Sequence, residues 1–122
     1  MDVLSYLGAA LTVIWGISHA CATRPVVAGF GDLTADNRRI ITMEWIVEAV
    51  ALVFVGAFVA VATAIDRQAA VSTGVYAVAI VMLVVLAVVS LFTGFRIRFL
   101  PFRLCPVIFA LAAALIALGA WL

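Results

Sequence analysis

Charge is what this sequence has least of. Only 11% of its 122 residues are charged, whereas about a quarter are in an ordinary soluble domain. Lysine is absent, all seven basic residues are arginine, and there is a single histidine. With 69% apolar residues and a net charge of +1, the chain has neither the surface of a soluble domain nor the basic patch of a nucleic-acid-binding protein. The composition therefore predicts an integral membrane protein.

Several kinds of chemistry are disfavoured by what is missing. The two cysteines, Cys21 and Cys105, do not make a disulfide framework, and we interpret them as small apolar side chains near helix ends. One histidine with a few acids supplies too few ligands for an ordinary metal site, so none is predicted. The turn Gly29–Asp32 (GFGD) lacks the glycine spacing and the lysine of a phosphate-binding loop. The N-terminus has no basic region before its apolar run, so we expect the first helix to be retained.

Long apolar runs predict four membrane-spanning helices. About 20 apolar residues cross the hydrocarbon layer, and runs of this length occupy residues 3–22, 40–65, 69–95 and 104–122. Their continuity excludes amphipathic helices of a soluble protein, and the lack of period-two alternation excludes a membrane β-barrel. We expect one all-α domain over residues 1–122, a polytopic four-helix up-down bundle. The helix of the second run begins before residue 40, with Thr34 or Asp36 as its cap.

Small residues recur at four-residue spacing within these runs. Helices associate in lipid through close packing of small side chains, because apolar collapse does not drive them together. We therefore expect helix–helix seams at two sets of positions: Gly8, Thr12, Gly16 and Ala20 in the first run, and Gly56, Ala60 and Ala64 in the second.

The arginines predict the orientation in the membrane. The first and third loops lie on the same side of a four-span bundle, and the other side holds only Arg67. Six arginines belong to the first and third loops: Arg24, Arg38, Arg39, Arg96, Arg98 and Arg103. Positive residues remain on the cytoplasmic side. We therefore expect a cell-membrane protein, in a prokaryotic inner membrane, with both termini extracytoplasmic.

Two carboxylates inside the second span are the most unusual feature of the chain. Glu44 and Glu48 are four residues apart, so they share one helix face. Ionisable groups in a membrane helix are costly and usually face the bundle interior or a wet cavity. At about 1.5 Å rise per residue, His19 should lie level with Glu44, and Trp15 level with Glu48.

These positions define a candidate ligand-binding site in the cytoplasmic half of the bundle. Its residues are His19, Glu44, Glu48 and Trp15, with Arg39 and Arg96 as counter-charges. The outer halves of the helices read as almost wholly apolar. Each residue also has a plainer interpretation: Glu48 as a buried hydrogen-bonding group between helices, the tryptophan as an interface anchor, and the arginines as topology signals. Whether the site performs catalysis stays open, although a histidine and a carboxyl group can form an acid–base pair.

Three short segments resemble a known family. Gly16-Ile17-Ser18-His19 ends the first span, Gly29-Phe30-Gly31 lies in the first loop, and Glu48-Ala49-Val50-Ala51-Leu52 lies in the second span. Together they resemble the DoxX-like small four-helix membrane proteins over about the first 65 residues, with histidine where the family often has lysine and Ala49 where a glycine is common. Family members are linked to membrane oxidoreductase assemblies, including a small subunit of a quinone-reducing enzyme. The resemblance thus implies a lipophilic redox ligand.

The leading hypothesis is a protein that binds a small lipophilic or amphipathic molecule. The family resemblance favours a quinone-like molecule. One alternative is a small homo-oligomeric transporter or channel in which Glu48 carries a proton or cation. Another is a structural or regulatory subunit of a membrane complex. A transporter needs a polar path to both faces of the membrane, and the apolar outer halves disfavour it.

Overall fold

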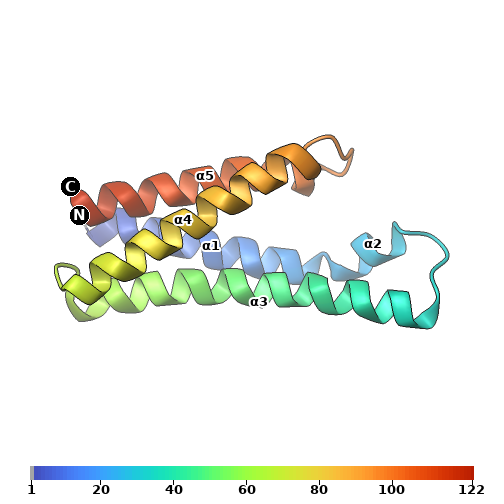
Figure 1. The fold of residues 1–122 in the computed structure, drawn as a ribbon, viewed down its shortest axis with the longest axis horizontal. Helices are drawn as coiled ribbons and strands as arrows, with labels where there is room; N and C mark the ends of the chain where they lie inside the picture. The colour runs from blue at the N-terminus through green and yellow to red at the C-terminus, as the bar shows by residue number, and fades with distance from the viewer. Residues whose placement is uncertain (1) are drawn as a thin grey trace.

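The fold is all-helical, as predicted. The computed structural model describes residues 2–122, and within them it contains no strand. It has five helices: α1 (Asp2–Cys21), α2 (Thr23–Ala28), α3 (Ala35–Asp66), α4 (Ala70–Thr93) and α5 (Leu100–Trp121) (Figure 1). All except α2 are long and apolar enough to span a membrane. The protein is therefore a multi-pass membrane protein with four candidate spans.

The helix boundaries depart from the apolar runs where local chemistry decides them. α3 begins at Ala35 because the Thr34 hydroxyl accepts a hydrogen bond from the Asn37 amide at 3.2 Å, which confirms Thr34 as the cap. α5 begins at Leu100, four residues before the predicted start. Pro101 occupies its first turn, where a missing amide hydrogen costs nothing.

The short helix α2 was not predicted. Its sequence was expected to be loop, but Val26 and Val27 are buried and the helix packs on the first turns of α3. Gly31, with a φ of 75°, follows it and lets the chain turn toward α3.

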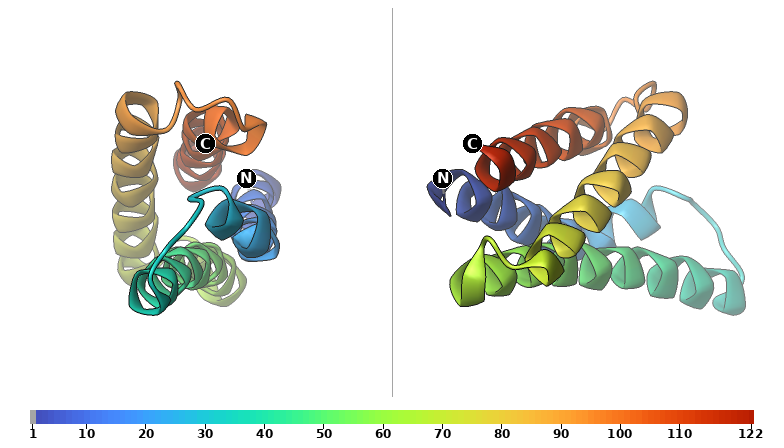
Figure 2. Two further views of the ribbon diagram at one scale, coloured as in Figure 1. Left: turned by 90° about the vertical axis from the view of Figure 1, so that its right-hand side faces the viewer. Right: turned by 60° about the vertical axis from the view of Figure 1, so that its left-hand side comes forward.

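The spans run up and down, so the bundle has two different ends. The N- and C-termini lie together at one end, called here the termini end, beside the α3–α4 hairpin (Figure 1). The opposite end, called here the α2 end, holds α2 and the α4–α5 loop. Helix α1 packs on both α3 and α5. Helix α4 starts beside α3 at the hairpin and then crosses to α5, so α3 and α4 diverge toward the α2 end (Figure 2).

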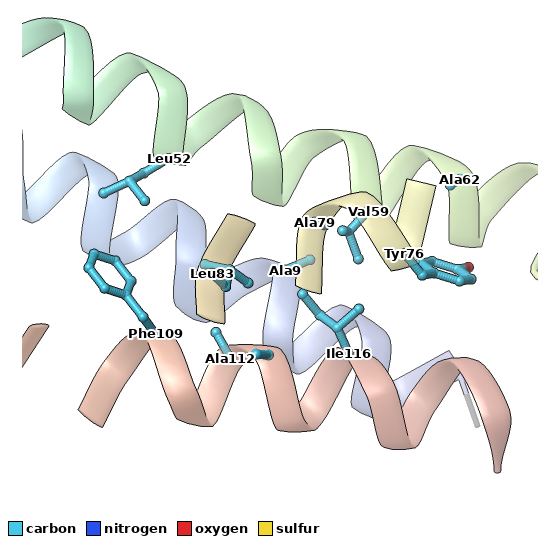
Figure 3. Close-up of a cluster of buried hydrophobic side chains, with 11 residues drawn as sticks. Ala9, Leu52, Val59, Ala62, Tyr76, Ala79, Leu83, Phe109, Ala112 and Ile116 are labelled. Atoms are coloured by element: carbon cyan, nitrogen blue, oxygen red, sulfur yellow. The ribbon is translucent and has the colours of Figure 1, made fainter. Parts of the chain in front are cut away.

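Apolar side chains fill the middle of the bundle. Leu52, Leu83 and Ile116 come from three different helices and are fully buried (Figure 3). Glycines bring α1 and α3 together: a Cβ added at Gly56 would lie 2.6 Å from the Ala9 carbonyl oxygen. Gly16 makes the same kind of contact with the backbone of α3. The predicted small-residue packing is thus present in part: Gly8 packs against α5, and Ala20 and Ala64 are exposed.

The termini end is more polar than the sequence analysis expected, and the prediction of almost wholly apolar outer halves is wrong. Thr63 on α3 and Tyr76 on α4 are buried, with their hydroxyl oxygens 2.9 Å apart. The Thr63 hydroxyl donates to the Val59 carbonyl at 2.8 Å, so Tyr76 donates to Thr63. A hydrogen bond of this kind satisfies two polar groups that are expensive to bury alone.

Arg67, in the α3–α4 hairpin, ties the termini end together. Its guanidinium donates to the Gly119 carbonyl on α5 at 2.8 Å and forms an ion pair with Asp2 on α1 at 2.9 Å. One side chain therefore connects the hairpin to both terminal helices. No such link joins α4 to α3 at the α2 end among the interactions of residues 2–122, which agrees with the divergence of these two helices there.

Candidate functional site

His19 lies near the end of α1, and an aromatic stack fixes its ring. Its side chain is only 6% exposed. The imidazole lies flat on the Trp45 indole of α3, with ring centroids 3.7 Å apart and an interplanar angle of 13°. The indole Nε1 also donates to the His19 carbonyl oxygen at 2.7 Å. Trp45 therefore orients the imidazole and gives the His19 carbonyl a second donor, beside the Ala22 amide at 3.2 Å.

Glu48 stands beside His19 but does not satisfy it. Glu48 Oε2 is 3.5 Å from His19 Nε2, beyond the 2.7–3.2 Å that is usual for a hydrogen bond of this type. His19 Nε2 is fully buried and has no hydrogen-bond partner within residues 2–122. Leaving a buried polar atom unpaired costs about 1–3 kcal/mol. The two side chains therefore form a loose pair without a hydrogen bond between them.

A chamber of about 340 Å³ adjoins this pair. It lies among the C-terminal turns of α1 and α4, the N-terminal turns of α5 and the middle of α3. Its polar lining residues come from all four spans: His19, Glu48, Ser90, Thr93 and Cys105. The rings of Trp45 and Phe102 and the aliphatic side chains of α4 complete the wall. The volume is within the range of small-molecule sites, which are mostly apolar with a few placed polar groups.

Most hydrogen-bond donors in the chamber wall are already used. The Ser90 and Thr93 hydroxyls each donate to a carbonyl one turn back at 2.6 Å, and the Cys105 thiol does the same at 3.3 Å. Their oxygen and sulfur atoms can still accept. The Glu48 carboxylate also accepts. The chamber thus complements a ligand group that donates hydrogen bonds, such as a hydroxyl or an amine.

The structure pairs His19 with Glu48, whereas the sequence analysis placed Glu44 level with His19. Glu44 is exposed, and it lines a shallow hollow on the surface of α3 together with Glu48. The depth estimate was wrong because it counted from Ile40, whereas α3 begins at Ala35 and its first turns run past the end of α1 beside α2 (Figure 1).

The remaining predicted residues lie outside the chamber wall. Trp15 is partly buried against the core, and its indole Nε1 is buried without a hydrogen-bond partner within residues 2–122. Arg39 pairs with Asp36 at 3.4 Å, and both side chains are more than three-quarters exposed. Arg96 is exposed in the α4–α5 loop, next to chamber-lining Ile97.

Sequence reasoning missed the aromatic part of the site. Neither Trp45 nor Phe102 was included in the predicted site. The two rings meet at a centroid distance of 5.6 Å and an angle of 59°. The signal for Trp45 was its place three residues before Glu48, which puts both on one helix face. Nothing in the sequence signalled Phe102, since its position follows from the course of the α4–α5 loop.

The chemistry open to this site is proton exchange and hydrogen bonding. In residues 2–122, no three side chains of His, Cys, Asp or Glu come together in a way that could hold a metal ion. A histidine and a carboxyl group that face the same small volume can donate and accept a proton.

Comparisons with known proteins do not place the chain in a family. No protein-family model matches the sequence, and no curated protein and no solved structure is significantly similar to it.

Proposed function

We propose that this membrane protein binds a small amphipathic molecule, with the polar head group of the molecule held in the chamber by His19 and Glu48. The observation that carries the proposal is the buried, unpartnered Nε2 of His19, 3.5 Å from a carboxylate on the wall of a chamber of ligand size. A ligand hydroxyl held by Glu48 would also satisfy Nε2 once it displaces the side-chain atoms that cover that nitrogen. The stacked and tilted rings of Trp45 and Phe102 suit a flat ring next to that hydroxyl.

A quinone-like ligand agrees with this chemistry. The reduced form of such a ring carries hydroxyl donors, and the oxidised form carries acceptors. His19 and Glu48 are also two of the residues that carry the DoxX-like resemblance, and they are neighbours in space. We include membership of that family, and transfer of protons to and from the bound ring, in the proposal.

The core of the bundle favours binding over transport. Leu52, Leu83 and Ile116, all fully buried, lie between the chamber and the termini end. An ion moving from the chamber toward that end would have to displace these side chains. The homo-oligomeric transporter and the complex subunit both stay predictions from the sequence, without a specific contact in their favour.

His19→Phe tests the head-group site. Phenylalanine keeps a flat ring against Trp45 but removes Nε2, so the bundle should remain folded while a hydroxylated probe binds at least about tenfold more weakly. The measurement is the Kd of methylhydroquinone, by calorimetry on detergent-solubilised protein. Glu44→Gln, on the exposed surface of α3, is the control and should leave the Kd unchanged. Equal affinity of His19→Phe and the unaltered protein would remove His19 from the site.

We further propose that the α2 end faces the cytoplasm of a prokaryotic cell, which would place the chamber in the cytoplasmic half of the inner membrane. A reporter enzyme active only in the cytoplasm, fused after Leu122, should then be inactive. The same reporter inserted in the α2–α3 loop, after Asp32, should be active. The reverse pattern would place the chamber near the opposite face of the membrane.

A further inference from the structure

An apolar groove runs along the seam between α3 and α4 on the termini side of the chamber. Its volume is about 460 Å³. Val55 and Phe58 line it from α3, and residues between Val71 and Met82 line it from α4. Phe58 is 61% exposed, so the groove is open to the outside of the bundle, where a membrane protein meets lipid. We call it the seam groove.

The seam groove and the chamber lie in line. On α4, Met82 lines the groove and Leu86, one turn further, lines the chamber. On α3, Val55 lines the groove and Glu48, two turns away on the same face, lines the chamber. The two hollows therefore follow one helix–helix seam, polar at the α2 end and apolar toward the termini end.

The chamber is also accessible from the side at this seam. The Glu48 side chain is 43% exposed, whereas that of His19 is 6% exposed. Glu48 borders both the chamber and the shallow surface hollow on α3. This exposure follows from the course of α4, which leaves α3 for α5 before it reaches the level of Glu48 (Figure 2).

We propose that the ligand is a lipid-like molecule that enters the chamber sideways from the bilayer, with its hydroxylated ring beside His19 and Glu48 and its hydrocarbon chain in the seam groove. This inference rests on the proposed function and specifies its ligand class. A water-soluble ligand would need only the chamber. A head group with an attached chain can use both hollows, because the chamber has polar lining residues and the groove that follows it along α3 and α4 is apolar.

The contribution of the chain to affinity is modest for a physical reason. A hydrocarbon chain gains little hydrophobic free energy when it leaves lipid for a protein groove, because both surroundings are apolar. It gains close packing, and it holds the ring in register with the chamber. The effect of blocking the groove should therefore be specific to chain-bearing molecules and about tenfold in affinity.

The test uses a variant that fills the seam groove without disturbing the fold. Gly74 lines the groove, and a Cβ added there meets no atom within 4 Å. Gly74→Leu should weaken the binding of decylhydroquinone about tenfold and leave that of methylhydroquinone unchanged. The control is Ala114→Leu, the same kind of enlargement at an exposed position of α5 that lines neither hollow. Affinities are measured in phosphatidylcholine nanodiscs and corrected for partitioning into protein-free nanodiscs.

The outcomes separate the two proposals. If both probes bind but Gly74→Leu and Ala114→Leu have the same affinity for decylhydroquinone, the chain does not occupy the groove, and the head-group site stands without it. If Gly74→Leu weakens both probes equally, the effect passes through the fold and the inference is wrong. If neither probe binds the unaltered protein, the hydroxylated-ring ligand is wrong, and the chain-bearing ligand is wrong with it.

Discussion

Glu48→Gln should weaken the binding of a hydroxylated ring at least about tenfold while the bundle remains folded. Glutamine keeps the shape of the side chain and one acceptor oxygen, but it removes the charge that strengthens a hydrogen bond from about 1 kcal/mol to about 1.5–3 kcal/mol. It also removes the carboxyl group that lies 3.5 Å from His19 Nε2. The measurement is the Kd of methylhydroquinone, taken alongside the thermal unfolding temperature in the same detergent.

Two further variants separate a binding role of Glu48 from a structural one. Glu44→Gln makes the same chemical change one turn away on the exposed surface of α3, and it should alter neither affinity nor stability. Glu48→Leu should abolish binding without lowering stability, since an ionisable group in a membrane span is costly and leucine is not. If Glu48→Gln binds the probe normally, Glu48 is only a hydrogen-bonding group between helices, and His19 loses its partner in the site.

The fold could be predicted because few backbone structures are stable in the hydrocarbon layer of a membrane. Every backbone polar group of a spanning segment must be satisfied within the segment, so a long apolar run becomes a helix. The cap at Thr34 was also readable, since a hydroxyl before a first turn is a local signal. The start of α5 was not, because Arg103 looks like the end of a loop and lies inside the helix. The helix α2 was missed because six residues carry too little periodicity to be recognised.

The site could be predicted only in part. His19 and Glu48 were identified because ionisable groups stand out in apolar runs, but their pairing depends on how far α3 extends past α1. The exposed positions of Glu44, Arg39 and Arg96 depend on the same offset and on the divergence of α4. The sequence alone does not give the offset between α1 and α3 or the divergence of α4, because both are set by packing between helices.

At the termini end, the sequence analysis missed polar contacts that the structure contains. Thr63 and Tyr76 are single polar residues inside apolar runs, and neither one alone indicates a contact. They form a buried hydrogen bond because the tight hairpin brings the end of α3 against the start of α4. Arg67 was taken only as the lone positive charge on its side of the membrane, yet it connects three helices. A firmly tied termini end and a diverging α2 end together confine the chamber to one half of the bundle.

The second large effect concerns the contact between α1 and α3. Gly56→Ala should lower the free energy of unfolding by about 1–3 kcal/mol, the usual cost of overpacking a tight interior. The added Cβ would lie 2.6 Å from the Ala9 carbonyl oxygen and 2.7 Å from a methyl group of Val13. The carbonyl belongs to a helix backbone and cannot turn aside. Helices α1 and α3 must therefore separate. Their separation would disrupt the small-residue packing between them and change the distance between His19 and Glu48. Reversible unfolding in mixed micelles of increasing denaturing detergent gives the free energy.

Gly74→Ala is the matched control for this variant. It makes the same substitution within a spanning helix, in the second turn of α4, but the added Cβ meets nothing within 4 Å. Alanine is a better helix former than glycine, so Gly74→Ala should be as stable as the unaltered protein or more stable by up to about 1 kcal/mol. The difference between the two variants isolates the contact between α1 and α3 from helix propensity. If Gly56→Ala is as stable as Gly74→Ala, the backbones of α1 and α3 do not approach as closely as the glycine seam requires, and the position of Glu48 beside His19 would have to be revised with them.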